Sequence, residues 1–244
     1  MEEIGLVVLL LVLPVLFFLT SRVRAGKTGD LRALPAMEEV PGSIGHAAET
    51  GQPLHISVGV AGVGGTATAE TWAGLTALTE LADEAAACDT PLIVTVSDPT
   101  VLPVAQNILQ RAYSRHGNPE GYDSTQVRFV SPDSTAYAAG LMGLVKQEPV
   151  VGNVMIGSFG DEYLLIGETW AQEGVRQIVG TNDPRTLPFV YASADETLVG
   201  EEMYASGAYT TRLPVQIASL LTEDWLRWAV VVVIMVVAAL KFFS

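Results

Sequence analysis

Apolar and polar positions are arranged along the chain in a pattern that predicts repeated units of strand, loop and helix. The first unit starts at Leu54, where β-branched residues alternate with other residues over 54–60 before a cluster of glycines. A helical pattern follows over about residues 66–87, with large apolar side chains at helical spacing. The next strand segment, residues 91–96, is nearly all apolar, which is typical of parallel sheets covered on both faces.

The same unit recurs through the middle of the chain. Later strands are predicted at residues 126–130, 150–156, 177–179 and 189–192, and a last helix is predicted from Ala194 through Ala208. Repeated units of this kind favour an α/β fold with a Rossmann-like, mostly parallel sheet and helices on both faces. We expect this α/β domain to occupy residues 53–213.

Two long apolar runs at the ends of the chain predict membrane-spanning helices. The first covers Ile4 to Leu19 and the second Trp228 to Leu240, and a span needs about 20 such residues. A cleaved signal peptide fits the first run poorly, because Glu2 and Glu3 precede it and no small-residue cleavage site follows. A buried core helix is the alternative for the second run, although core helices are seldom apolar on every face.

The resulting domain plan has five parts. We expect transmembrane helices at residues 1–21 and 228–244, with the α/β domain between them. Residues 22–52 are predicted to be a linker, because glycine and proline interrupt every long element, leaving room for one short surface helix. Residues 214–227 are predicted to be an amphipathic connector. The sequence therefore predicts an integral membrane protein. The positive charges that flank the apolar runs predict that its central domain lies in the cytoplasm.

Composition excludes several classes of function. The formal net charge is −14 and the sequence pI is about 4.5, so the surface is unsuited to nucleic acid, which needs a basic partner. The single cysteine, Cys88, cannot form an internal disulfide. The three histidines, His46, His55 and His116, lack the spacing of a zinc site, so no metal site is predicted.

Four loops are the candidate ligand-binding elements. Right-handed crossovers place every loop after a strand at one edge of a parallel sheet, and the loops AGVGGTAT, SDPT, SPDST and GSFGDE all follow predicted strands. Their glycines, hydroxyl groups and acids stand where helices begin, and helix N-termini favour anions. The candidate ligand-binding residues are Gly62, Gly64, Gly65, Thr66, Asp98, Asp133, Ser158 and Gly160.

The glycine loop matches a dinucleotide fingerprint only in part. With Gly62 and Gly64 as its first two glycines, the third position falls on Ala67, and Asp98 stands later than a ribose-binding acid usually does. No lysine of the phosphate-loop type is present. The alternative is structural: the glycines let the first helix pack on the sheet, and the acids cap helices. Ser158 has no evident histidine partner, so no catalytic residue and no cofactor is assigned.

Five segments of the chain are distinctive: GVGGTATAET, PLIVTVSDP, AYAAGL, IGSFGDEYLLI and GEEMYASGAY. Together they resemble an uncharacterised family of two-span bacterial membrane proteins that carry a domain of unknown function. The resemblance covers most of residues 50–228 and implies the two-span layout, but no reaction and no ligand.

The function expected from the sequence follows from tethering at both ends. We expect a non-catalytic structural or assembly subunit of a membrane protein complex, whose partners are the lipid bilayer and homo- or hetero-oligomeric membrane proteins. Helices rich in small residues, such as Ala136 to Gly143, would pack against those partners. The alternative is a sensor or enzyme that binds a nucleotide or another small ligand at the glycine-rich loop edge of the sheet.

Overall fold

The computed structural model describes residues 14, 16–24, 34–206, 209, 217–222, 225–228, 230–231 and 234–235. The chain divides into two compact units, of which one is the α/β body, Ala33–Ser206, and the other is formed by the two ends of the chain.

The α/β body is built around one sheet of six parallel strands. The strands are β1 (Leu54–Gly59), β2 (Leu92–Val96), β3 (Val127–Phe129), β4 (Gly152–Ser158), β5 (Arg176–Thr181) and β6 (Glu196–Val199). Their order across the sheet is β3-β2-β1-β4-β5-β6, and each neighbouring pair is parallel. This is the strand order of doubly wound dinucleotide-binding folds, and it confirms the predicted Rossmann-like α/β class.

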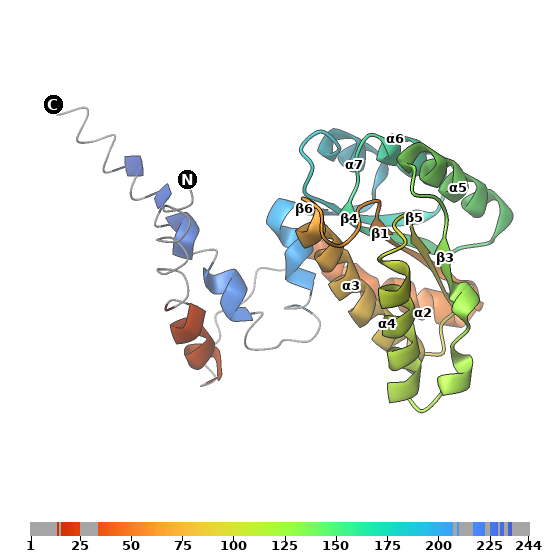
Figure 1. Cartoon of the computed structure of the whole chain (residues 1–244), viewed down its shortest axis with the longest axis horizontal. Coiled ribbons are helices and arrows are strands. Elements are labelled where there is room, and N and C mark those ends of the chain that lie inside the picture. The colour runs from red at the N-terminus through yellow and green to blue at the C-terminus, as the bar shows by residue number, and fades with distance from the viewer. Residues whose placement is uncertain are drawn as a thin grey trace. The chain divides into compact units, whose positions relative to one another are not determined.

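Helices cover both faces of the sheet, as Figure 1 shows. The larger helices are α2 (Pro35–Thr50), α3 (Thr68–Ala87), α4 (Leu102–Arg115), α5 (Ser134–Gln147), α6 (Glu162–Gln172) and α7 (Leu187–Ser193). Helices α2 and α3 contact β1, and α3 packs on α4 on one face, while α5, α6 and α7 pack side by side on the other. Short 3₁₀ helices follow α4 and β6: η1 (Pro119–Gly121), η2 (Ser124–Gln126) and η3 (Gly200–Ala205).

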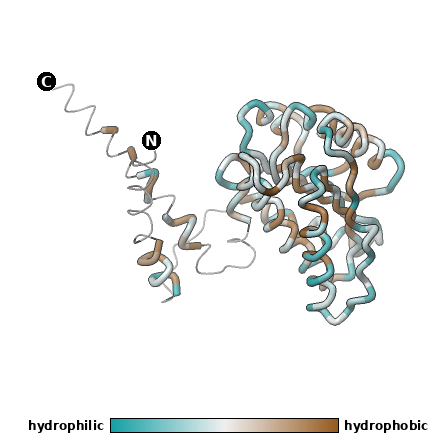
Figure 2. Tube along the Cα trace, viewed as in Figure 1, coloured by the Kyte–Doolittle hydropathy of each residue, from teal (hydrophilic) through white to brown (hydrophobic). Residues whose placement is uncertain are grey.

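Burial explains why the strands read as apolar runs. Every residue of β1 and β2 is buried, and Figure 2 shows hydrophobic residues gathered in the middle of the α/β body, with hydrophilic residues on many of its outer loops. Side chains alternate between the two faces, so Ile93 joins the core cluster that holds Tyr137 of α5 and Trp170 of α6. The opposite face of β1 carries Val58, which lies against α3.

The prediction of a linker over residues 22–52 is wrong for the second half of that segment. Pro35–Thr50 forms the 16-residue helix α2, which buries Ala36, Ile44 and Ala47 and contacts α3, β1 and β6. Proline did not prevent this helix. Pro35 stands at its first turn, where the missing N–H group is not needed, and Pro41 inside the helix removes one backbone hydrogen bond without ending it. Gly51 ends the helix with a positive φ of 68°.

The end of the α/β body also differs from the sequence prediction. Residues 189–192, predicted as a strand, lie in helix α7, and residues 196–199, predicted as helix, form strand β6. Pro188 occupies the first turn of α7, where a proline is well tolerated. Strand β6 pairs with β5 from Ile178↔Glu196 to Thr181↔Val199, so neighbouring-strand hydrogen bonds decide its conformation.

The predicted integral-membrane location is contradicted. Within the residues that the structure describes, no helix has the length and the apolar character needed to cross a bilayer. The described helical stretch at residues 16–24 includes only the last four residues of the first apolar run, together with Arg22 and Arg24 beyond it, whereas a span needs about 20 predominantly apolar residues. The predicted spans 1–21 and 228–244 otherwise lie largely outside the described residues.

The described parts of the terminal unit form a small apolar cluster. Leu19 and Val23 from the beginning of the chain pack with Ile217 and Ala218 from near its end. Residues 217–222, within the predicted connector 214–227, are helical. The two ends of the chain therefore meet in one unit.

Candidate functional site

The loops that follow the strands meet at the carboxyl edge of the sheet. The strand order reverses between β1 and β4, which lie side by side at the centre. In open α/β sheets, ligands bind in the crevice outside the carboxyl ends of the strands at this reversal point. The residues that follow β1 and β4 are therefore the strongest candidates for a ligand-binding site.

Glycine is required where β1 and β4 end. Gly59 has a φ of 93°, and a Cβ atom there would lie 2.6 Å from the carbonyl oxygen of Ser158. The N–H group of Val60 donates to that same oxygen at 2.9 Å. The predicted residue Ser158 therefore binds the end of β1 through its backbone, and β1 and β4 approach each other closely at the reversal point.

The glycine loop between β1 and α3 is tied down by threonine hydroxyls. Gly64 N–H donates to Thr68 Oγ1 at 2.9 Å, and Thr71 Oγ1 donates toward the carbonyl groups of Ala61 and Gly62. Gly64, Gly65 and Thr66 are exposed, and a Cβ at either glycine would meet nothing within 4 Å. The tip of the loop is open to solvent at the start of α3.

Asp98 lies against the glycine loop. A Cβ at Gly62 would lie 2.6 Å from Asp98 Oδ1, and Val63 N–H donates to Thr100 Oγ1 at 3.2 Å. Asp98 does not cap the next helix as predicted, because α4 begins only at Leu102. Its Oδ1 instead accepts from the backbone N–H and the hydroxyl of Thr100. Its Oδ2 takes no part in these two hydrogen bonds and lies against Gly62.

The other predicted residues are placed as caps and loop supports. Asp133 accepts from Ala136 N–H at 2.8 Å and caps α5, as the structural alternative predicted. Gly160 N–H donates to Glu162 Oε1 at 2.6 Å. Gly62 and Asp98 are thus brought into contact, while Asp133 and Gly160 bond within their own loops.

Acids dominate the charge of this edge. The described loops and first helical turns after the strands carry Glu70, Asp98, Asp133, Asp161, Glu162, Asp183, Glu201 and Glu202, against the single base Arg185. That base is held by Asp183 through a 2.7 Å ion pair, whose hydrogen bonds raise the pKa of Arg185 and lower the pKa of Asp183. Within the described residues, no group of three or more His, Cys, Asp or Glu side chains is arranged to hold a metal ion.

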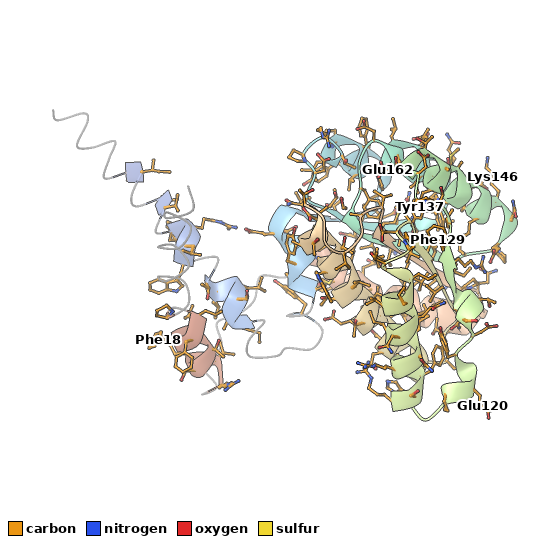
Figure 3. All side chains as sticks on the ribbon, viewed as in Figure 1. Phe18, Glu120, Phe129, Tyr137, Lys146 and Glu162 are labelled. Atoms are coloured by element: carbon orange, nitrogen blue, oxygen red, sulfur yellow. The ribbon has the colours of Figure 1, made fainter. Side chains whose placement is uncertain are left out.

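A buried polar network beneath α5 and α6 was not predicted. His55 is fully buried, and its ring binds Asn153 Oδ1 at 2.7 Å and Thr95 Oγ1 at 2.9 Å. Tyr137, labelled in Figure 3, binds Ser57 at 2.6 Å and Thr95 at 2.8 Å. The only signal in the sequence is an isolated polar residue within otherwise apolar strand segments, such as Thr95 in β2 and Asn153 in β4, together with His55 and Ser57 in β1.

Burial dominates the protonation of this network. It lowers the pKa of His55 to about 4, and the hydrogen bond that the ring makes to Asn153 only partly opposes this. Burial also raises the pKa of Tyr137 to about 12. The imidazole and the phenol are both neutral at pH 7, which is the state that an apolar interior favours.

Comparisons with known proteins identify a family but no activity. The model of the DUF6754 family, described as a domain of unknown function, matches residues 2–244. A crystal structure of glucose-6-phosphate 1-dehydrogenase from Mycobacterium avium is similar at 16% identity and a TM-score of 0.35, over 62% of this chain and 36% of the dehydrogenase. No curated protein matches this chain.

Proposed function

The chain thus belongs to the DUF6754 family, and we propose that its α/β body binds a small, uncharged or cationic ligand rich in hydroxyl or amine groups at the carboxyl edge of the sheet. The observation that carries the proposal is the contact between the glycine loop and Asp98 beside the β1–β4 reversal point. The role is that of a binding or sensing domain.

The loop geometry supports a ligand that approaches the backbone closely. Gly64 and Gly65 leave the tip of the loop without side chains, and both are exposed. The start of α3 follows at Thr68 and offers the N–H groups of a helix N-terminus. Asp98 stands beside the loop with one carboxylate oxygen left over from its bonds to Thr100, and such an oxygen accepts from ligand hydroxyls.

Charge decides the class of ligand. A helix N-terminus stabilises an anion by about 0.3–1 kcal/mol. One carboxylate about 8 Å from a ligand charge opposes it by about 2 kcal/mol at an effective dielectric constant of about 20. Since the edge carries several acids and one paired base, repulsion outweighs the helix. A nucleoside or polyol fits the edge better than a free di- or triphosphate does.

A binding experiment on the full chain tests this. We expect adenosine, as a neutral probe with vicinal hydroxyls, to raise the thermal unfolding midpoint more than ATP does, both without Mg²⁺. Asp98→Asn should abolish the shift, whereas the matched control Asp123→Asn, whose carboxylate caps the distant η2, should keep it. Equal shifts in both variants, or a larger shift with ATP, would refute the proposal.

A second candidate function is assembly with further protein chains. The observation that favours it is the exposure of large apolar side chains on the described residues of the terminal unit: Phe17 (80%), Trp225 (65%) and Trp228 (69%), together with Phe18, Val230, Val231, Ile234 and Met235. Patches of this kind mark interaction surfaces. The chain would then act as a non-catalytic assembly subunit that joins copies or partners through its two ends.

The oligomeric state separates the two candidates. Light scattering after size-exclusion chromatography of the full chain should give a mass above one chain if the terminal unit mediates assembly. The double variant Trp225→Ser/Trp228→Ser should return it to a monomer, while Trp72→Ser on the exposed side of α3 serves as the control. A monomeric wild type would remove the assembly candidate and leave ligand binding untouched.

A further inference from the structure

The buried polar network crosses the sheet as one continuous chain of hydrogen bonds. From Thr95 on β2 it passes to His55 on β1 and then to Asn153 on β4. Asn153 Nδ2 donates to Gln177 Oε1 on β5 at 3.3 Å, and Gln177 Nε2 donates to the carbonyl groups of Gly167 and Ser193. The register explains this, because His55 pairs with Asn153 and Asn153 with Gln177 along one row of the sheet.

Two backbone carbonyls fix the direction of every bond in this chain. A carbonyl can only accept, so the amide of Gln177 must present its nitrogen to Gly167 and Ser193 and its oxygen to Asn153. Asn153 then presents its own oxygen to His55. The imidazole therefore carries its proton on Nδ1, and Nε2 is left as an acceptor.

The same logic continues through three hydroxyl groups toward the reversal point. Thr95 must donate to His55 Nε2, so Tyr137 donates to Thr95 and Ser57 donates to Tyr137. The chain ends where Ser57 Oγ accepts from Gly59 N–H at 3.3 Å. Gly59 is the residue with positive φ that touches Ser158 beside the glycine loop.

Adding a proton at Nε2 is incompatible with this order. Nε2–H would face the Thr95 hydroxyl proton, so Thr95 would have to turn its proton toward Tyr137. The Tyr137 proton would then turn to Ser57 at 2.6 Å, because its other acceptor, the Thr95 carbonyl oxygen, lies at 3.4 Å, which is longer than an ordinary O–H···O bond. Ser57 would reverse in turn. The reversed Ser57 hydroxyl would then need an acceptor beside the Gly59 N–H group, which can only donate. Protonation of His55 would therefore leave a hydroxyl donor without an acceptor at Ser57, next to the end of β1.

We propose that this network is an acid-sensitive conformational switch, in which proton uptake at His55 reverses the hydroxyl chain and loosens both α5 and the β1–β4 contact at Gly59. Helices α3 and α4, on the other face of the sheet, stay in place. The switch goes beyond the proposed ligand binding and does not depend on it.

Few other charges act on His55. From β3 and the end of α5, Arg128 and Glu148 oppose each other in their effect on its pKa and form an ion pair with each other. From α6, Trp170 stacks on the ring with centroids 4.8 Å apart. Tyr137 is the titratable group of α5 in the network, and Glu162 raises its pKa.

The sign of the pH effect follows from burial. The unfolded chain takes up a proton at His55 near pH 6.5, and the folded chain only near pH 4. The stabilising contribution of the neutral ring is therefore complete above about pH 6.5. It is lost progressively as the pH falls from about 6.5 to about 4. At pH 4 the folding equilibrium constant should be lower by roughly 100-fold on account of this residue.

The ring itself can be observed directly, because the chain holds only three histidines. In His46→Gln/His116→Gln, which removes two exposed rings, ¹⁵N spectra of His55 should show the Nδ1–H tautomer down to about pH 5. Amide exchange near pH 4 should then increase in Ser134–Gln147 more than in Thr68–Ala87 of the same sample. A proton on Nε2, titration above pH 6, or equal exchange in both helices would overturn the switch.

A variant separates the switch from general acid sensitivity. Urea unfolding of the wild type should show the folding equilibrium constant falling by roughly 100-fold between pH 6.5 and pH 4 on account of His55. In His55→Gln this part of the fall should be absent. The double variant His46→Gln/His116→Gln should retain the full pH-dependent fall. If His55→Gln does not fold, the ring spectra and the exchange comparison still decide the matter, since neither needs that variant.

Discussion

Gly74 tests whether the one glycine of α3 serves helix–sheet packing or only weakens the helix. It lies inside α3, where glycine is about 1 kcal/mol less favourable than alanine. A Cβ there would lie 3.2 Å from the Cα of Val58 and closer still to the carbonyl oxygen of Ile156. Both atoms belong to the backbone of buried strands, so neither can move aside easily.

The expected result of Gly74→Ala is a net loss of stability. Overpacking of a buried contact costs about 1–3 kcal/mol, which exceeds the helix-propensity gain of about 1 kcal/mol, so we expect a loss of up to about 2 kcal/mol. The matched control is Gly143→Ala in α5, whose Cβ would meet only the flexible Gln147 side chain at 3.7 Å. That substitution should stabilise the protein by about 0.5–1 kcal/mol.

Urea unfolding of both variants at pH 7, followed by circular dichroism, supplies the measurement. Opposite signs are the expected outcome, with Gly74→Ala unfolding at lower urea than the wild type and Gly143→Ala at higher urea. If both variants gain stability equally, α3 is not held against β1 and β4 as closely as described, and the packing argument fails.

Two further substitutions probe single hydrogen-bonding groups. Tyr137→Phe removes the hydroxyl that Ser57 and Thr95 bind in the buried network, and we expect a loss of about 1–3 kcal/mol in urea unfolding; no loss would mean that water replaces the hydroxyl. Asp133→Ala removes the cap of α5 and should lower stability by about 1 kcal/mol, while Asp133→Asn, a capping residue of the same size, should restore most of it in thermal unfolding.

Strong periodicity made most of the α/β body predictable. The first strand and helix were expected at residues 54–60 and 66–87 and are found at Leu54–Gly59 and Thr68–Ala87. Short elements were not predictable, because their conformation depends on partners. The β-branched and aromatic residues of α7 resemble a strand, and Asp195 resembles a helix cap, but its carboxylate accepts from Gln177 N–H on β5.

The sequence predicts at which edge of the sheet the candidate site lies, but not which side chains contact one another within the protein. Loops after parallel strands must share one edge, so Gly62 and Asp98 could be expected near each other. The network of His55 could not be found in this way, because Asn153 lies 98 positions and Thr95 40 positions from it along the chain. Only the strand register brings these residues into one row.

The central pairing of β1 with β4 has a consequence for folding kinetics. Strands β1 to β3 with their helices, and β4 to β6 with theirs, are each built from neighbouring segments of the chain. The seam between these halves closes a loop of 98 residues at the His55–Asn153 contact. Contacts of such long sequence separation form slowly, so we expect the two halves to acquire local structure first and the seam, with its buried imidazole, to be completed late.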